Sequence, residues 1–160
     1  MRQSTPSLPR LLTAPLRLVP NIVHSTALGV ALSRLFALLV RDGELDFLQD
    51  RVLRIAIEDA GIEYRLTKSR GRLVAVDRQQ PVAASISGTL YDFLLLATRR
   101  EDADTLFFQR RLRMEGDTEV GLMVKNLLDG LEYSLPHVPE PIQSAGERAV
   151  AFCERFVVRP

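Results

Sequence analysis

The chain is poor in the residues that build disulfides and zinc centres. Its 160 residues include one cysteine and two histidines. One cysteine cannot form an internal disulfide, and one Cys with two His is a ligand short of a tetrahedral zinc site. A chain of this length buries about 70% of the surface that its unfolded form exposes, so its core needs neither support. Secreted disulfide scaffolds and zinc fingers are therefore excluded, and a reducing, cytoplasmic location is expected.

The residues best suited to catalysis lie in unrelated parts of the chain. His24 falls in an N-terminal helix, His137 in a proline-rich loop and Cys153 in the last helix. Nucleophilic catalysis needs a base beside the nucleophile and a third group that orients the base. The carboxylates of Glu115-Gly116-Asp117 fit a strand-to-helix joint better than a metal site, because acids favour a helix start. We therefore predict no catalytic residue, no metal and no cofactor.

Charge is divided unevenly along the chain. Residues 1–41 hold five arginines and no acid, whereas the rest holds 16 basic and 20 acidic groups. Four prolines in the first 20 residues favour an extended arm. On an anionic membrane surface each cation contributes about 1 kcal/mol, and we expect Arg2, Arg10 and Arg17 to make such contacts. No nucleic-acid partner is expected, because the body shows no basic face or reading motif.

Residues 21–40 predict an amphipathic helix, with leucines at helical spacing on one side. A membrane span is disfavoured, since Arg34 inside the hydrocarbon would cost about 2.5–3.5 kcal/mol. A signal peptide is disfavoured as well, because Arg41-Asp42-Gly43-Glu44 stands where a small-residue cleavage site belongs. The helix packs on its own domain or lies on a membrane surface, and both hold if only the arm touches lipid.

Alternating apolar residues predict strands over 51–58, 62–66, 72–76, 82–87 and 111–115, the second and third joined as a hairpin. Helices are predicted over 90–99 after a capping box at Thr89 and Asp92, from Asp104 or Thr105, after Asp117, and after a capping box at Ser144 and Glu147. This order indicates an α+β fold, a mainly antiparallel β-sheet covered on one face by helices.

Large, flexible apolar side chains gather on elements that should face one another across this sheet. They are Phe93, Phe107, Phe108, Met114, Leu122, Met123 and Leu127. Residues of these types usually fill a core, but they also line lipid-binding tunnels when helices stand off a sheet. Both interpretations remain open at this point.

Three nearly contiguous stretches carry a resemblance to a known family. Residues 104–112 (DTLFFQRRL), 114–122 (MEGDTEVGL) and 124–129 (VKNLLD) closely resemble the signature of the UbiT family of ubiquinone biosynthesis accessory factors, and residues 42–48 (DGELDFL) are also similar. That family has the SCP2-like sterol carrier fold. The resemblance implies a lipid carrier that is not an enzyme. We expect the seven apolar residues to line its hydrophobic tunnel, because they converge on the sheet and the helices that cover it.

The resemblance further implies an accessory factor of oxygen-independent ubiquinone biosynthesis. Such a factor binds isoprenoid quinone precursors or phospholipid and presents them to the iron–sulfur hydroxylases UbiU and UbiV. The alternatives are an assembly module for a ubiquinone biosynthesis complex and a general phospholipid or sterol-type carrier. The expected organisation is a basic arm (1–20), an SCP2-like domain (21–135) and a proline-rich linker with a C-terminal helix (136–160), in a cytoplasmic, peripherally membrane-associated protein.

Overall fold

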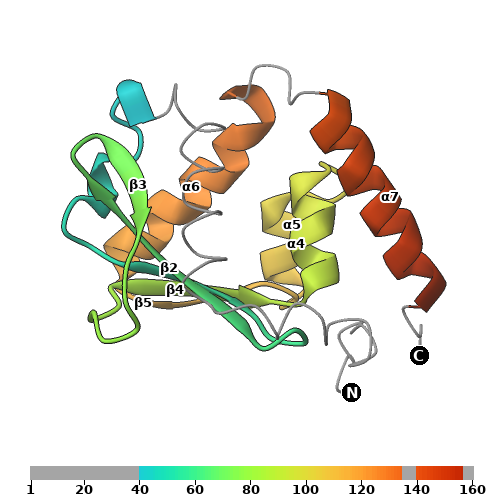
Figure 1. The fold of residues 1–160 in the computed structure, drawn as a ribbon, viewed down its shortest axis with the longest axis horizontal. Helices are drawn as coiled ribbons and strands as arrows, with labels where there is room; N and C mark the ends of the chain where they lie inside the picture. Colours follow the sequence, from blue (N-terminus) through green and yellow to red (C-terminus); the bar gives the residue numbers. More distant parts are fainter. Residues whose placement is uncertain (1–39, 135–139, 157–160) are drawn as a thin grey trace.

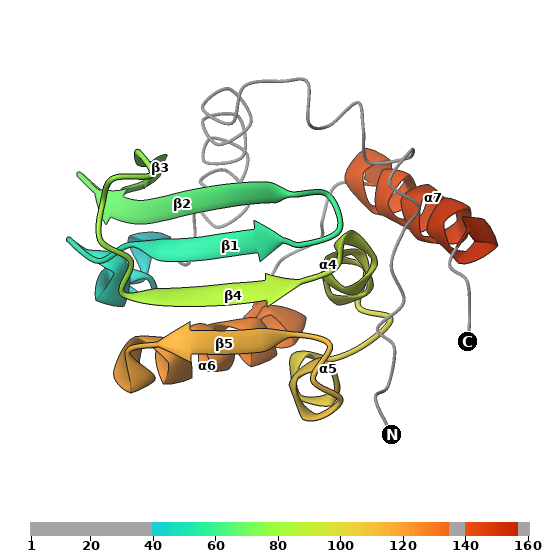
Figure 2. The ribbon, with the colours of Figure 1, turned by 90° about the horizontal axis from the view of Figure 1, so that it is seen from below.

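A five-stranded sheet forms the centre of the computed structural model, which describes residues 40–134 and 140–156 (Figure 1). The strands are β1 (Leu53–Ile57), β2 (Ile62–Ser69), β3 (Arg72–Ala75), β4 (Ala84–Gly88) and β5 (Arg113–Gly116). They lie in the order β3-β2-β1-β4-β5, and all neighbours are antiparallel except β1 and β4 (Figure 2). The predicted α+β fold with a mainly antiparallel sheet is confirmed. The predicted arm and nearly all of the predicted helix over 21–40 lie outside the described residues.

The turn between β2 and β3 explains their hairpin. Ser69 pairs with Arg72, which leaves Arg70 and Gly71 as the connection. Both have positive φ, +49° and +71°. Two consecutive left-handed residues match the twist of the strands they join, and glycine adopts that conformation without strain. The hairpin predicted from this sequence is confirmed.

The two faces of the sheet differ in chemistry. Leu53, Leu66 and Ala84 occupy paired positions on β1, β2 and β4 and are all buried on the helix side. On the opposite face, Glu63 forms ion pairs with Arg54 at 2.9 Å and with Arg65 at 2.8 Å. Figure 2 views the sheet from this solvated face, and α6 lies behind the strands. Such alternation is typical of a sheet with one buried and one solvated face.

The helices gather on the apolar face (Figure 1). They are the short 3-10 helix η1 (Asp46–Leu48), α4 (Leu90–Ala97), α5 (Ala103–Phe108), α6 (Thr118–Ser134) and α7 (Glu140–Phe156). Helix α6 contacts β4 and β5, whereas α7 packs against α4. Within residues 40–134 and 140–156, no helix is long and apolar enough to cross a membrane.

Two predicted helix caps are confirmed. The Thr89 side chain accepts from the Asp92 backbone N–H and Asp92 accepts from the Thr89 N–H, which completes the capping box of α4. Asp117 Oδ1 accepts from the backbone N–H of Glu119 at 2.9 Å and of Val120 at 3.0 Å, so Asp117 starts α6. These side chains bind N–H groups that have no partner within the helix.

Three predicted helix boundaries are wrong. Helix α4 ends at Ala97 and not at residue 99, because Arg99 turns to a φ of +57°. Helix α5 begins at Ala103, because Asp102 Oδ1 reaches the Thr105 N–H at 2.7 Å, so the helix opens before the predicted Asp104 or Thr105.

Helix α7 begins at Glu140, so Ser144 and Glu147 lie inside it and do not form the predicted capping box at its start. Pro141 falls in its first turn. A proline is tolerated there because its missing N–H would have no partner within the helix.

The core consists of two clusters of buried residues. The first joins η1, the sheet and α6, and contains Leu45, Leu48, Leu53, Leu73, Ala84, Val120 and Val124. The second lies under α4 and α5 and contains Ile86, Leu106 and Leu112. Ile55, Met114 and Leu128 pack against both clusters. The sheet is therefore covered by one layer, whose two sides we call the η1–α6 side and the α4–α5 side.

Candidate functional site

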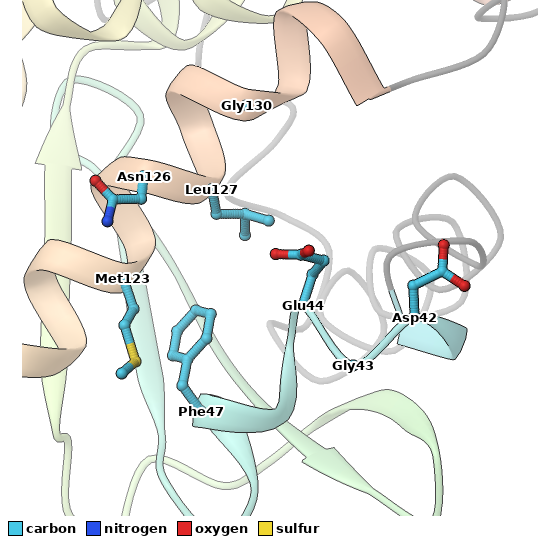
Figure 3. A pocket seen from close by; sticks show the side chains of 8 residues that line it. All are labelled: Asp42, Gly43, Glu44, Phe47, Met123, Asn126, Leu127 and Gly130. Atoms are coloured by element: carbon cyan, nitrogen blue, oxygen red, sulfur yellow. The ribbon is translucent and has the colours of Figure 1, made fainter.

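A pocket of about 480 Å³ lies between α6 and the segment that leads into η1 (Figure 3). It is lined by Asp42, Gly43, Glu44, Phe47, Met123, Asn126, Leu127 and Gly130. Its volume is in the range of about 300–1,000 Å³ found for small-molecule sites. The pocket therefore has room for an organic ligand or part of a longer one.

One wall of the pocket is a single face of α6. Its four lining positions, 123, 126, 127 and 130, recur at the spacing that places side chains on one side of a helix. The adjacent stripe holds Val120 and Val124, which are 0% and 2% exposed in the first core cluster. The buried stripe fixes the helix on the sheet, and the lining face borders the first core cluster, against which Leu127 packs.

The other wall, residues 42–47, is fixed to the core and the sheet on the side that faces away from the pocket. Leu45 is buried in the core cluster, while its neighbour Glu44 lines the pocket. Gly43 has a φ of +84°, and its carbonyl accepts from the Asp46 N–H at 2.9 Å, which makes the turn. Lys68 of β2 forms an ion pair with Asp46 and donates to the Val40 carbonyl at 3.3 Å. The wall is thus anchored to the sheet.

The pocket has an apolar end and a polar end. Figure 3 shows Phe47 beside Met123 at one end, while the Glu44 carboxylate points toward Leu127 and Asp42 lies farther along the same wall. The aromatic, thioether and aliphatic groups offer a flexible surface to a hydrocarbon. The Glu44 carboxylate offers a hydrogen-bond acceptor, whereas the Asp42 carboxylate points away from the other lining side chains. This arrangement suits a molecule with an apolar part and a polar part.

The described residues around the pocket include no reactive centre. In the described ranges, 40–134 and 140–156, no group of three His, Cys, Asp or Glu residues could hold a metal. Cys153 is buried in α7, where burial raises the pKa of its thiol, and the carboxylates of Asp59 and Glu154 raise it further. A raised thiol pKa disfavours the thiolate, which is the nucleophilic form.

The structure divides the seven apolar residues that the sequence singled out. Met123 and Leu127 line the pocket. Phe93, Phe107 and Met114 are half-buried and pack against the second core cluster. Met114 also packs against the first core cluster, as Leu127 does, so it lies between the two regions. A tunnel that joins these five residues remains a prediction.

The other two apolar residues are exposed to solvent. The exposed fraction is 91% for Phe108, at the end of α5, and 58% for Leu122, on α6. The predicted membrane contacts Arg2, Arg10 and Arg17 lie outside the described residues.

Sequence reasoning missed most of the pocket. Phe47, Asn126 and Gly130 were not singled out, although residues 42–48 had shown a family resemblance. The spacing from Met123 to Gly130 marks a helix face, which could have added Asn126 and Gly130 to Met123 and Leu127. The packing of residues 42–47 against that face has no local sequence signal.

A comparison with models of protein families assigns the chain to a family. The model of the SCP-2 sterol transfer family matches residues 32–129, more than half of the sequence. The matched residues include both pocket walls apart from Gly130. The chain therefore belongs to the SCP-2 sterol transfer family, a non-enzymatic class of lipid-carrier proteins.

Relatives within that family narrow the assignment. The ubiquinone biosynthesis accessory factor UbiT of Escherichia coli strain K12 is 41% identical over 135 residues, which cover 84% of this chain and 76% of that protein. The same figures hold for UbiT of Escherichia coli O157:H7. Within the family, the chain is a ubiquinone biosynthesis accessory factor of the UbiT type.

A solved structure agrees on the fold. It is a UbiJ-SCP2 ubiquinone synthesis protein with a TM-score of 0.55 and 16% sequence identity, and the match covers 70% of this chain and 93% of that one. At this identity the likeness shows the SCP2-like fold alone.

Proposed function

We propose that this accessory factor carries a lipid in the pocket between η1 and α6 and takes part in oxygen-independent ubiquinone biosynthesis. In this role it binds isoprenoid quinone precursors or phospholipid and presents them to the hydroxylases UbiU and UbiV. The observation that carries the proposal is the pocket itself, in which Phe47, Met123 and Leu127 offer hydrocarbon surface in a chain of the SCP-2 family. A carrier needs no catalytic group.

The energetics of burial support a lipid ligand. Each methylene removed from water contributes about 0.8 kcal/mol, so ten contribute roughly 8 kcal/mol before the costs of ordering the ligand and the protein. The thioether of Met123 and the branched chain of Leu127 can adapt to an irregular hydrocarbon. Apolar contacts of this kind hold a polyprenyl tail without requiring one particular tail structure. They leave the ring free for another protein to modify.

The test is the lipid content of the full chain after gentle purification. We expect mass spectrometry of an organic extract to find lipid at close to one molecule per chain. Met123→Trp should fill the pocket and lower that content several-fold. Leu122→Trp is the matched control, because the neighbouring Leu122 side chain is 58% exposed and does not line the pocket.

Two results would contradict the proposal. One is a protein that carries no lipid and takes none up from vesicles. The other is a Met123→Trp variant that keeps the parent lipid content while folding normally.

One observation favours the assembly module as a second function. Phe108 is 91% exposed at the end of α5, and large exposed aromatic residues are common anchors of protein interfaces. If this residue docks a partner, Phe108→Ser should weaken co-purification of UbiU and UbiV while the lipid content stays the same. An unchanged yield of both hydroxylases would remove Phe108 from the proposal.

We also propose that the N-terminal arm brings the carrier to the membrane. Its support is the five arginines and the absence of acids in residues 1–41. Replacing Arg2, Arg10 and Arg17 with Ser should weaken binding to anionic vesicles by up to about 3 kcal/mol, or roughly 150-fold. Flotation with anionic and with neutral vesicles measures this. Equal flotation of variant and parent, or no effect of anionic lipid, would show that the arm has another task.

A further inference from the structure

The hairpin of β2 and β3 carries charge of one sign. Residues 64–76 contain four basic residues and no acid. Two of the four, Arg65 and Lys68, form ion pairs within the protein. The other two, Arg70 and Arg72, are exposed at the turn and have no ion-pair partner in the part of the chain that the structure describes. The turn therefore presents two free guanidinium groups to the surroundings.

The geometry of the turn gives no local reason for an arginine at position 70. Arg70 has a φ of +49°, in the left-handed region that is uncommon for residues with a side chain. Asparagine is favoured before the glycine of such a two-residue turn. Arg99 and Arg110 also have positive φ, but they follow α4 and α5, where a cation is favourable at the negative end of the helix dipole. Arg70 follows no helix, so its charge needs another explanation.

The hairpin is joined to the wall of the pocket. Lys68 of β2 forms an ion pair with Asp46, which belongs to that wall. The hydroxyl of Thr67 donates to the carbonyl of Leu48, next to the wall, at 2.9 Å. The hairpin and η1 lie at the same end of the sheet, away from α4, α5 and α7 (Figure 1). A surface that binds the turn therefore sets the direction in which this wall of the pocket faces.

The adjoining acids do not lie on the hairpin. Asp42 pairs with Arg41 at 3.5 Å, and Asp46 is held by Lys68. Glu44 is exposed on the segment that leads into η1. Charges in water are screened within about 8 Å at physiological ionic strength, so the contact at the turn depends on the turn's own two cations.

The chemistry of the turn fits a surface rich in phosphate. A guanidinium group binds phosphate oxygens through two parallel hydrogen bonds and keeps its charge at every physiological pH. Anionic lipid surfaces attract basic segments, and a lipid carrier has to exchange its ligand with such a surface. A nucleic-acid site would be expected to show a wider basic face or a reading motif, which the turn does not have.

We propose that the β2–β3 turn, through Arg70 and Arg72, docks the folded domain on the anionic surface of a lipid bilayer and orients the pocket toward it. The inference rests on the proposed lipid-carrier function. It adds to the N-terminal arm a second contact, which belongs to the folded domain and is joined to the pocket.

The experiment measures binding of the full chain to vesicles by flotation. One set of vesicles contains phosphatidylcholine alone, and the other contains equal amounts of phosphatidylcholine and phosphatidylglycerol. Arg70→Asn combined with Arg72→Gln should weaken binding to the mixed vesicles on the order of 30-fold, because each cation contributes roughly fivefold near an anionic surface. Binding to phosphatidylcholine alone should not change. The unfolding temperature should not fall, since Asn-Gly is the preferred sequence for this turn.

Arg99→Asn combined with Arg110→Asn is the matched control. These two arginines are exposed, have left-handed backbones that asparagine tolerates, and lie on the α4–α5 side. The control removes the same charge from the protein and should bind the mixed vesicles with nearly the parent affinity.

Two further readouts connect the turn to the membrane and to the pocket. Mixed vesicles should slow hydrogen exchange of the backbone amides of residues 70–72 and leave those of residues 99–101 unchanged. The variant at 70 and 72 should take up lipid from the mixed vesicles more slowly than the parent, yet reach the same lipid content after long incubation.

The outcomes distinguish this contact from the carrier function. Parent-like flotation of the variant at 70 and 72, an equal loss in the control, or unchanged hydrogen exchange at the turn would overturn the membrane contact alone. Parent-like flotation with loss of co-purified UbiU and UbiV would assign the turn to a protein interface and overturn it as well. An unchanged rate of lipid uptake would overturn the orienting role. A parent protein that takes up no lipid from any vesicle would overturn the carrier function.

Discussion

The η1–α6 side and the α4–α5 side of the helical layer use similar side chains with different results. Under α4 and α5, Leu106 is 0% and Leu112 1% exposed, and Phe93 packs on them as part of a closed core. Between η1 and α6, Phe47 and Met123 are half-buried around a cavity. Apolar composition therefore does not decide between core and pocket.

The two sides differ in what accompanies the apolar residues. On the α4–α5 side, Arg111 Nε donates to the Asp92 carboxylate at 2.7 Å and ties the entry of β5 to the start of α4. On the η1–α6 side, Gly130 leaves space, and Glu44 keeps one end polar. The first set links two elements through an ion pair with a buried carboxylate, whereas the second lines a cavity.

The largest effect is expected from breaking the ion pair that closes the α4–α5 side. Asp92 is 0% exposed, so Arg111→Met leaves a buried carboxylate without its cation. We expect a loss of about 3–5 kcal/mol in the free energy of unfolding, measured in urea. Arg100→Met removes an exposed pair with Glu154 and should cost less than about 1 kcal/mol. Similar losses in the two variants would contradict this role of Asp92 and Arg111.

A cavity made in the core of the α4–α5 side tests whether lipid reaches that side. Leu106→Ala should cost about 2–5 kcal/mol, because Leu106 is fully buried and its neighbours cannot fill the space. The lipid content per folded molecule should stay at the parent value, since Leu106 does not line the pocket. Calorimetry and lipid extraction measure the two effects. Loss of lipid from a folded Leu106→Ala protein would show that the ligand reaches the α4–α5 side.

A smaller effect of opposite sign is expected at Gly130. Gly130→Ala should stabilise the protein by about 0.5–1 kcal/mol, because alanine favours the helix and its methyl group has room. Gly121→Ala should gain less, since its methyl group would press on Met114. Urea unfolding of both variants gives the difference. An equal gain at the two positions would argue against open volume at 130.

The smallest effect concerns the outer face of the sheet, which is remote from both sides. Burial alone raises the pKa of Glu63, but hydrogen bonds and charges from Arg54 and Arg65 outweigh it and lower the pKa below its ordinary 4.5. The Glu63 carboxylate therefore stabilises the fold above its unfolded pKa, and this contribution is lost as the pH falls through the folded pKa.

Glu63→Gln tests this sign. The variant should be less stable than the parent at neutral pH, and the difference should shrink as the pH falls below about 4.5. Urea unfolding across this range measures it. A difference that does not change with pH would show that the two arginines do not favour the charged form.

Elements set by neighbouring residues were predictable from sequence. The capping box at Thr89 and Asp92, the cap at Asp117 and the turn at Arg70 and Gly71 each depend on a few adjacent side chains. The parallel pairing of β1 with β4 was not predicted, because a contact between distant segments leaves no local pattern. Phe47 was not predicted as a pocket residue for the same reason, because its position depends on how residues 42–47 pack against α6.

The central claim is that lipid occupies the η1–α6 side and not the α4–α5 side. The most direct measurement is photo-crosslinking of the full chain with a bound lipid that carries a diazirine at the end of its tail, followed by peptide mass spectrometry. The account predicts labels on Phe47 and Met123, at the apolar end of the pocket (Figure 3). Labels on Phe93 and Phe107 in place of these residues would contradict it.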